Sequence, residues 1–309
     1  MLKKFKIGIT GASGLIGSKL CEFYSSHGHE VSIITRAKRK INFKNLKIYE
    51  TDLSNPDIQI IKKFTKNIDF LFHLASELKE DSKMVSTNYE STKLFVDILV
   101  NTKTTLVYMS SIGVFDFNFN KVITEHSEKK QINKYEKTKF LSEKYIYGLK
   151  KKLKFIIIRP SIILDLKMKS NIIKNLIALN SLKIRPKISH SVLANFVLSS
   201  DVINALIELS KEKKSIGESF NISSNVYLAE FMLEISNITN KKPYISIPLN
   251  IFFILIKIIS FMTNRRNVGS LIVFFSNTSR VSSEKIENFL DLKISRNFSH
   301  FLKKYIEKK

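Results

Sequence analysis

Thr10-Gly11-Ala12-Ser13-Gly14-Leu15-Ile16-Gly17 follows a short apolar run, residues 6–10, and opens a helix-length segment. Three glycines spaced in this way between a strand and a helix form a turn that binds the diphosphate of a dinucleotide, and the N–H groups at the start of the helix face the anion. A turn without a ligand is the alternative, but it would place three of the chain's nine glycines there. We therefore predict cofactor contacts at Gly11, Ser13, Gly14, Leu15, Ile16 and Gly17.

The sequence around this turn alternates short apolar runs with longer amphipathic segments, which predicts βαβ units and a parallel sheet. The expected strands are Lys6 to Thr10, Val31 to Thr35, Leu46 to Glu50, Ile68 to His73, Thr105 to Met109 and Phe155 to Arg159. The expected helices are Leu15 to His27, Thr87 to Asn101 and Asn133 to Leu149, with Gly28 and Asn101 as C-terminal stops.

Residues after Pro160 show longer apolar helices broken by prolines, which indicates a smaller lobe. Asn195 to Asp201 and Ser219 to Ile222 are predicted to return as strands of the first domain. We therefore expect an α/β protein with a doubly wound, Rossmann-like parallel sheet and a smaller C-terminal substrate lobe. The sheet domain would comprise residues 1–165 and receive 195–222, and the lobe would comprise 166–194 and 223–309.

Composition narrows the choice of partner. The chain has 309 residues, 44% of them hydrophobic, and a net charge of +24, which would attract polyanions. However, its lysines are scattered and clusters such as 38–40 and 211–214 are short, so we predict solvated faces and no nucleic-acid partner. A single cysteine, Cys21, cannot form an internal disulfide or a zinc site, and we expect no metal. The N-terminus has no long apolar stretch, which favours a cytoplasmic protein.

The residues after the second predicted strand bear on the choice of cofactor. NAD-selective sites place Asp or Glu there to bind the ribose hydroxyls, whereas this chain has Thr35 and Arg36. Arg36 can bind a 2′-phosphate through two charge-assisted hydrogen bonds, and Lys38, Arg39 and Lys40 add positive potential. We therefore favour NADP over NAD, the alternative being a solvated basic loop. Residues after the third and fourth strands are expected to line the same cleft: Asp52, Leu53, Leu74, Ala75 and Ser76.

The pair Tyr135 and Lys139 is one of four Tyr-x-x-x-Lys matches in the chain. It alone starts a helix after the strand that leads into Ser111, and strand ends of this kind face the ligand. Lys139 would lie one turn from Tyr135, where its ammonium stabilises a phenolate. A free phenol has a pKa of about 10, so acid–base work at neutral pH requires it to be lowered. Glu143 continues the same face, and we expect it to pair with Lys139.

Taken in order, these landmarks resemble those of the extended short-chain dehydrogenase/reductases, the NAD-dependent epimerase/dehydratase family. The matching residues are Gly11 to Gly17, Asp52-Leu53, Leu74-Ala75-Ser76, Asn88, Ser110-Ser111, Tyr135 and Lys139 with Glu143, and Arg159-Pro160. The resemblance implies an NAD(P) cofactor that also contacts Asn88, Tyr135, Lys139 and Pro160. In the mechanism that it implies, Ser111 binds the reacting oxygen, Tyr135 transfers the proton, and Lys139 holds the ribose and lowers the pKa of Tyr135.

Residues 171–180, 196–205 and 279–292 are similar to those of bacterial enzymes that epimerise or reduce nucleotide-linked sugars at C4. We therefore expect a homodimeric nucleotide-sugar epimerase or reductase that transfers a hydride at a sugar carbon, C4. The alternatives are an NADPH-dependent reductase of a non-sugar ketone or aldehyde and a noncatalytic dinucleotide-binding regulator. Ala194 stands where such enzymes often have a diphosphate-binding arginine, and Arg185, Lys187 or Arg280 would substitute.

Two apolar stretches near the C-terminus have two interpretations. Ile247 to Met262 and Leu271 to Phe275 are shorter than the roughly 20 residues that span a bilayer. They form either helices buried in the substrate lobe or an interfacial helix on a membrane. The second interpretation predicts peripheral membrane contact through residues 247–275.

Overall fold

The computed structural model of the chain describes residues 4–36, 46–117, 121–168, 172–182, 184–241, 245–254 and 274–308. Within these residues the central sheet has seven strands in the order β11-β7-β5-β4-β1-β2-β3, all paired in parallel. The strands are β1 (Lys6–Thr10), β2 (Glu30–Thr35), β3 (Leu46–Glu50), β4 (Phe70–His73), β5 (Thr105–Met109), β7 (Lys154–Pro160) and β11 (Ser219–Ile222). The order reverses between β1 and β4, which is where a doubly wound sheet opens a ligand crevice. The predicted fold class is confirmed.

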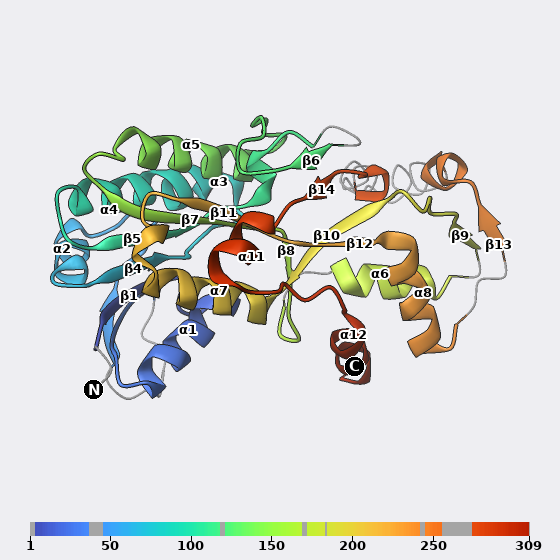
Figure 1. Ribbon diagram of the computed structural model, residues 1–309, viewed down its shortest axis with the longest axis horizontal. Coiled ribbons are helices and arrows are strands. Elements are labelled where there is room, and N and C mark those ends of the chain that lie inside the picture. The colour runs from blue at the N-terminus through green and yellow to red at the C-terminus, as the bar shows by residue number, and fades with distance from the viewer. Residues whose placement is uncertain are drawn as a thin grey trace.

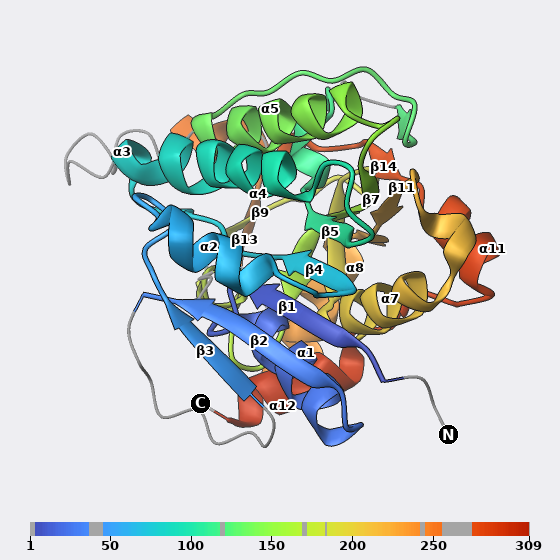
Figure 2. The same cartoon turned by 90° about the vertical axis from the view of Figure 1, so that its left-hand side faces the viewer.

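Helices cover both faces of this sheet (Figures 1 and 2). One face carries α1 (Leu15–Ser26), α7 (Ser199–Lys211) and α11 (Glu284–Leu290), and the other carries α2 (Ile58–Thr65), α4 (Ser91–Leu99) and α5 (Lys134–Gly148). The alternation of β7 fits this arrangement, since Ile156 and Ile158 enter the first core whereas Phe155 and Ile157 enter the second. Buried strands of a parallel sheet are apolar on both faces for this reason.

Local signals explain where the helices begin and end. Asn133 and Glu136 form a capping box at the start of α5, which satisfies backbone N–H groups at that end. Gly28 (φ 78°) and Asn101 (φ 60°) follow α1 and α4 in the left-handed conformation, so both predicted stops are confirmed. The expected helix Thr87 to Asn101 is α4 preceded by the short α3 (Asp81–Met84) and the π-helical turn η1 (Val85–Glu90).

A second sheet, of three strands, is separate from the central one. The other described strands and helices are β6 (Val122–Ile123), β8 (Ile162–Leu164), β9 (Ile184–Pro186), β10 (Leu193–Leu198), β12 (Ser224–Tyr227), β13 (Ile245–Ile247), β14 (Arg280–Val281), η2 (Ile112–Val114), η3 (Lys213–Ser215), α6 (Ile172–Asn180), α8 (Leu228–Thr239) and α12 (Ser299–Glu307). Strand β10 pairs in parallel with β8 and antiparallel with β12. Side chains of α6, α8 and α12 pack with this sheet in a separate apolar core.

One predicted strand is wrong in two respects. The structure places β10, which overlaps the expected strand Asn195 to Asp201, in the three-stranded sheet rather than in the central one. The strand ends at Leu198, and α7 begins at Ser199 with Asp201 in its first turn, a position that favours acidic side chains. The expected strand Ser219 to Ile222 is confirmed as β11, which pairs with β7.

The C-terminal apolar stretch is described only in part, because residues 255–273 lie outside the described residues. Residues 249–254 are helical. Phe252 and Phe275 are buried, whereas Ile251 and Ile254 are 45% and 56% exposed. Among the residues that the structure describes, no helix has the length and apolar character needed to cross a membrane.

Candidate functional site

The glycine turn between β1 and α1 is packed so closely that side chains would not fit. Gly11 has φ of 70°, and a Cβ there would lie 2.8 Å from the backbone nitrogen of Ala75. A Cβ on Gly17 would lie 2.3 Å from the carbonyl oxygen of Gly11. The N–H of Gly14 donates to that same oxygen at 2.9 Å. The turn therefore brings the start of α1 close to the end of β4, as the motif predicts.

A pocket of about 250 Å³ opens above this turn. Its lining comes from the carboxyl ends of β1, β2, β3 and β4 and from the segment after β4. The lining residues are Gly11, Ser13, Gly14, Ile34, Thr35, Arg36, Thr51, Asp52, Leu53, Leu74, Ala75, Ser76, Glu77, Lys83 and Thr87. The structure thus brings together most of the residues predicted to hold a dinucleotide. Leu15, Ile16 and Gly17 form the first turn of α1, where Ile16 enters the apolar core.

Glu77 and Lys83 are charged lining residues that the sequence reasoning did not identify. Hydrogen bonds from the backbone N–H groups of Lys79, Glu80 and Leu78 hold the pKa of the Glu77 carboxyl below its usual value, and the charge of Arg36 adds to this effect. No sequence motif predicts that three backbone N–H groups bind the Glu77 carboxylate. The predicted basic contribution of residues 38–40 lies outside the described residues.

A buried chain of hydrogen bonds fixes the ends of β1 and β4. Thr10 Oγ1 lies 2.7 Å from His73 Nδ1 and accepts from the N–H groups of Leu74 and Ala75. On the other side of the ring, His73 Nε2 lies 2.9 Å from Thr92 Oγ1. Because Thr92 donates to a backbone carbonyl, His73 must donate through Nε2 and accept from Thr10 through Nδ1. Burial lowers the pKa of His73 to about 3, so the ring is neutral.

Asn88 joins the segment after β4 to α5. Its Oδ1 accepts from Ser76 Oγ at 3.2 Å and from the Glu77 N–H at 2.6 Å. Its Nδ2 donates to the Glu77 carbonyl and to Thr138 Oγ1. Asn88 is buried within η1 and does not line the pocket in the described part of the chain. The structure therefore gives it the role of positioning Ser76.

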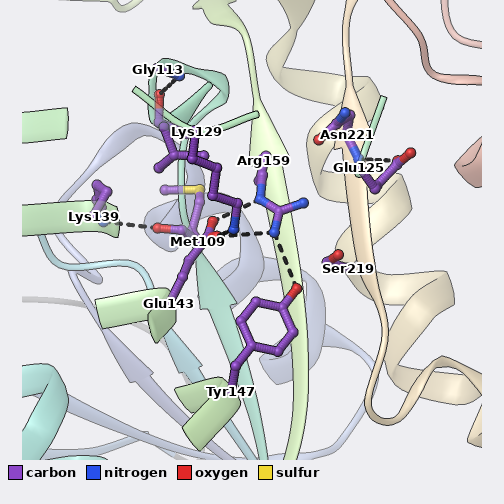
Figure 3. Close-up of polar contacts among 12 residues, drawn as sticks. Met109, Gly113, Glu125, Lys129, Lys139, Glu143, Tyr147, Arg159, Ser219 and Asn221 are labelled. Atoms are coloured by element: carbon purple, nitrogen blue, oxygen red, sulfur yellow. Dashed lines mark hydrogen bonds and ion pairs between the residues drawn. The ribbon is translucent and has the colours of Figure 1, made fainter. Parts of the chain in front are cut away.

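Ser111, Tyr135 and Lys139 meet where β5 ends and α5 begins. The side chains of Ser76 and Ser111 act on the Tyr135 hydroxyl and lower its pKa, which partly offsets the effect of burial. Ser111 Oγ accepts from the Gly113 N–H at 3.1 Å. Lys139 Nζ donates to the Met109 carbonyl at 2.8 Å (Figure 3) and lies 5.9 Å from the centre of the Tyr135 ring. The sequence-selected pair thus lies beside the predicted serine.

The acid–base state of this group differs from the expectation. Burial raises the pKa of Tyr135 to about 12, whereas a lowered value was expected from Lys139. Burial also lowers the pKa of Lys139 to about 7, and the charge of Glu143 partly opposes this. The difference has a physical cause, since removal from water disfavours both the phenolate and the ammonium. Tyr135 is therefore protonated at neutral pH and can donate a hydrogen bond.

The expected pairing of Glu143 with Lys139 is wrong. Glu143 Oε1 lies 2.7 Å from Arg159 Nε, and Oε2 accepts from Arg159 Nη2 at 2.9 Å and from Lys129 Nζ at 2.6 Å (Figure 3). Burial raises the pKa of the carboxyl, but Arg159 and Lys129 together hold it below its ordinary value. Helical spacing suggested Lys139, but the register of β7 presents a guanidinium that binds both carboxylate oxygens. Pro160 follows as the last residue of β7.

The proposed substitutes for the missing diphosphate arginine differ in accessibility. Arg185 is buried, and its donors reach Asn180, Ser236 and the carbonyls of residues 182 and 241. It is therefore occupied within the lobe. Arg280 is exposed on β14, which pairs with β6. Its neighbour Val281 packs in the same core as η2, the turn that follows Ser111.

Comparison with known proteins gives a consistent picture. The model of the NAD dependent epimerase/dehydratase family matches residues 7–223. A curated relative, the ADP-L-glycero-D-manno-heptose-6-epimerase of Brachyspira hyodysenteriae, is 25% identical over 157 residues, which is 47% of this chain and 49% of that protein. The match thus spans about half the length of the curated relative.

Solved structures resemble the chain over nearly its whole length. An epimerase-like protein from Burkholderia cenocepacia is 17% identical with a TM-score of 0.76, covering 98% of this chain and 97% of that one. The UDP-glucuronic acid 4-epimerase of Bacillus cereus, in complex with NAD, is 17% identical with a TM-score of 0.74, covering 98% and 99%. The terminal R domain of the myxalamid biosynthetic pathway is 14% identical with a TM-score of 0.81, covering 100% and 91%. At these identities the likeness shows the fold.

Proposed function

Because the chain belongs to the NAD dependent epimerase/dehydratase family, we propose that it is an NAD(P)-dependent nucleotide-sugar epimerase or reductase that transfers a hydride at a sugar carbon, C4. One observation carries the proposal: the side chains of Ser76 and Ser111 both act on the Tyr135 hydroxyl and lower its pKa, and Ser76 also lines the pocket above the glycine turn. A proton-transfer group thus adjoins the space for a nicotinamide dinucleotide.

The residues of the pocket fit such a cofactor. Backbone N–H groups at the start of α1 would hold the diphosphate, since Gly14 precedes the helix and carries no side chain to block the approach. Lys139 would hold the nicotinamide ribose. When bound, the cofactor supplies the hydride chemistry, while the protein supplies position and electrostatics.

The three side chains at the strand end have distinct roles in the proposed reaction. Ser111 donates a hydrogen bond to the reacting oxygen of the sugar. Tyr135 gives its proton to that oxygen as a carbonyl is reduced, or takes the proton as an alcohol is oxidised. The Lys139 ammonium stabilises the phenolate that remains after proton donation, because opposite charges a few ångströms apart favour the ionised form. A reductase completes one such transfer, and an epimerase reverses it on the other face of the sugar.

The cofactor that we propose is NADP in preference to NAD. Arg36 and Lys83 both line the pocket at the end of β2, where a 2′-phosphate would lie. The carboxylate of Glu77, which also lines the pocket, is held by three backbone N–H groups. The Bacillus cereus structure that resembles this chain contains NAD, and for this reason the cofactor choice needs a direct binding measurement.

The proposed substrate is a nucleotide sugar. It would enter between two parts of the chain: the sheet domain, residues 1–165 and 195–222, and the lobe, residues 166–194 and 223–309. The names of the relatives support this class, since one is a heptose epimerase and another acts on UDP-glucuronic acid. Arg280 would bind the diphosphate, because it is exposed beside η2 whereas Arg185 is occupied. We also propose that the protein is a cytoplasmic homodimer with peripheral membrane contact through residues 247–275.

A product assay tests the proposal. The purified protein is incubated with UDP-sugars and UDP-4-keto sugars, with NADPH or NADH, and both absorbance and sugar products are followed. A C4 epimer without net cofactor consumption identifies an epimerase, and stoichiometric oxidation of NADPH identifies a reductase. Dinucleotide binding without turnover of any sugar would contradict the proposed activity and would favour a regulator.

A further inference from the structure

The end of the substrate lobe that lies farthest from the central sheet exposes large apolar side chains. In Figure 1, β9, β13 and the helical residues 249–254 lie at the right-hand end of the molecule, and α2 lies at the opposite end. The exposed fraction is 49% for Leu182, 55% for Ile245, 45% for Ile251 and 56% for Ile254. Single exposed aliphatic residues are ordinary on proteins, but these four come from segments that lie together at one end of the molecule.

Hydrogen bonds join the segments that carry these side chains. Strand β13 pairs with β9 in parallel, and the Lys187 N–H donates to the Ile247 carbonyl at 2.8 Å. Lys241 Nζ donates to Ser181 Oγ at 3.1 Å, which places an ammonium next to the position of Leu182. We call these exposed side chains the tip surface: Leu182, Lys187, Lys241, Ile245, Ile251 and Ile254.

The charge of the lobe has one sign along two long stretches of sequence. Residues 166–200 contain six lysines and arginines, residues 235–283 contain another six, and neither stretch contains Asp or Glu, although the chain has 27 acidic residues. The exposed basic side chains among the described residues of these stretches include Lys167, Lys174, Lys187, Lys241 and Arg280. The tip surface therefore combines aliphatic side chains with lysines, and all of them come from stretches of sequence without Asp or Glu.

A bilayer with anionic headgroups matches both properties of the tip surface. Aliphatic side chains enter the boundary between headgroups and acyl chains, and lysines are attracted by anionic lipid at roughly fivefold in affinity for each lysine. A nucleic acid would match the lysines, but its phosphate contacts would leave the four aliphatic side chains exposed. Among the described residues no helix has the length and apolar character to cross a membrane, and the proposed contact is peripheral.

We infer that the tip surface docks on a membrane containing anionic phospholipid. The dinucleotide pocket lies among the ends of β1 to β4, at a distance from β9 and β13 (Figure 1), so docking leaves it open. The inference deepens the proposed peripheral contact and rests on it, but it does not depend on the proposed reaction.

Vesicle flotation of the full chain tests the inference. The protein is mixed with vesicles of phosphatidylcholine alone or of phosphatidylcholine with phosphatidylglycerol, and the bound fraction is measured. We expect binding to the mixed vesicles that weakens as salt is added. The double variant Ile251→Glu and Ile254→Glu should bind at least tenfold more weakly. The double variant Lys187→Ala and Lys241→Ala should bind roughly twentyfold more weakly.

Helix α2 at the opposite end of the molecule supplies matched controls. Ile58 is 52% exposed, and Lys62 and Lys63 are exposed lysines of the same helix. Ile58→Glu and the double variant Lys62→Ala and Lys63→Ala should bind vesicles as the unchanged protein does. Unaltered dinucleotide binding and unfolding midpoints confirm that each variant is folded.

Three results would overturn the inference: no binding to the mixed vesicles, equal binding to vesicles of phosphatidylcholine alone, or equal losses in the α2 variants. Tip variants that dissociate a dimer while vesicle binding persists would assign the surface to a second copy of the chain, which also overturns it. An inactive protein that still binds vesicles contradicts only the proposed reaction. An active protein that binds no vesicles contradicts only the membrane contact.

Discussion

Lys139 Nζ donates a 2.8 Å hydrogen bond to the carbonyl of Met109, the last residue of β5. This bond, drawn in Figure 3, ties α5 to the strand that leads into Ser111. Lys139 lies one turn after Tyr135, the second residue of that helix. The same bond keeps an amine buried. Because burial lowers the pKa of the Lys139 amine, its protonation affects the stability of the protein in a range of pH that can be measured.

The free energy of unfolding should depend on pH through Lys139. Burial lowers the pKa of Lys139 from 10.5 to about 7 in the folded protein, so the unfolded chain binds more protons between these values. The contribution of this group to stability therefore rises as pH increases from about 7, by up to about 1.4 kcal/mol per pH unit. We expect urea unfolding of Lys139→Met to lack this rise when both proteins are compared from pH 7 to 9.

Lys137→Met is the control for this comparison, because Lys137 is an exposed lysine of the same helix. Its stability profile should run parallel to that of the unchanged protein. Parallel profiles for the unchanged protein and Lys139→Met would show that the ammonium is not destabilised by burial, contrary to the structure.

The pair of Glu143 and Arg159 should be the most costly ion pair to break. Both side chains are buried, with exposed fractions of 0% and 1%, and removal of one partner leaves an unpaired buried charge. Glu143→Ala should lower the free energy of unfolding by about 3–5 kcal/mol. Lys129→Ala, which removes a partly exposed cation from the same carboxylate, should cost much less. Equal losses in the two variants, measured by urea unfolding, would refute this assignment.

Two glycines of the chain should respond to alanine in opposite ways. A Cβ on Gly17 meets the Gly11 carbonyl at 2.3 Å, whereas a Cβ on Gly148 meets nothing within 4 Å. Gly17→Ala should lower stability by about 1–3 kcal/mol through overpacking and weaken dinucleotide binding at least tenfold. Gly148→Ala should be neutral or stabilising by up to about 1 kcal/mol, since alanine favours the helix. Tight dinucleotide binding by Gly17→Ala would contradict the close packing of the turn.

The sequence was most informative where the signal is local. Residues 10–17 carry the strand, the turn and the helix start in eight consecutive positions, and the structure confirms each. Predictions failed where the partner is distant in the chain. Residues 195–198 were predicted as a strand, and they form the end of β10. The sheet that this strand joins depends on its partners β8 and β12, which the local sequence does not indicate. Lys139 lies four residues before Glu143, yet the Glu143 carboxylate pairs with the guanidinium of Arg159 in β7.

Residues that hold other groups in place through hydrogen bonds were the hardest to predict from the sequence. Thr10 and His73 are 63 residues apart and meet only because β1 and β4 are neighbours. Glu77 lines the pocket because its carboxylate closes a local turn. By contrast Arg36, Asp52 and Ser76 could be predicted, since each follows a strand of the parallel sheet, whose carboxyl ends meet at one edge.

Arg36 should distinguish the two dinucleotides. It lines the pocket, and a bidentate contact with a 2′-phosphate is a charge-assisted interaction. Arg36→Ala should weaken binding of adenosine 2′,5′-bisphosphate about tenfold or more and leave binding of adenosine 5′-monophosphate unchanged, as measured by calorimetry. Lys79→Ala, an exposed cation of the same region outside the pocket lining, should change neither. Similar affinities for both nucleotides in the unchanged protein would remove the preference for NADP.

The proton-transfer role of Tyr135 is the central claim, and single-turnover oxidation of NADPH by a UDP-4-keto sugar tests it most directly. Tyr135→Phe keeps the ring and removes only the hydroxyl whose pKa Ser76 and Ser111 lower. Tyr145→Phe removes a hydroxyl on the same helix that instead binds Asp97. We predict a rate lower by about 10²–10⁴ in Tyr135→Phe at unchanged NADPH affinity, and an unchanged rate in Tyr145→Phe. A Tyr135→Phe rate within about twofold of the unchanged protein would contradict the mechanism.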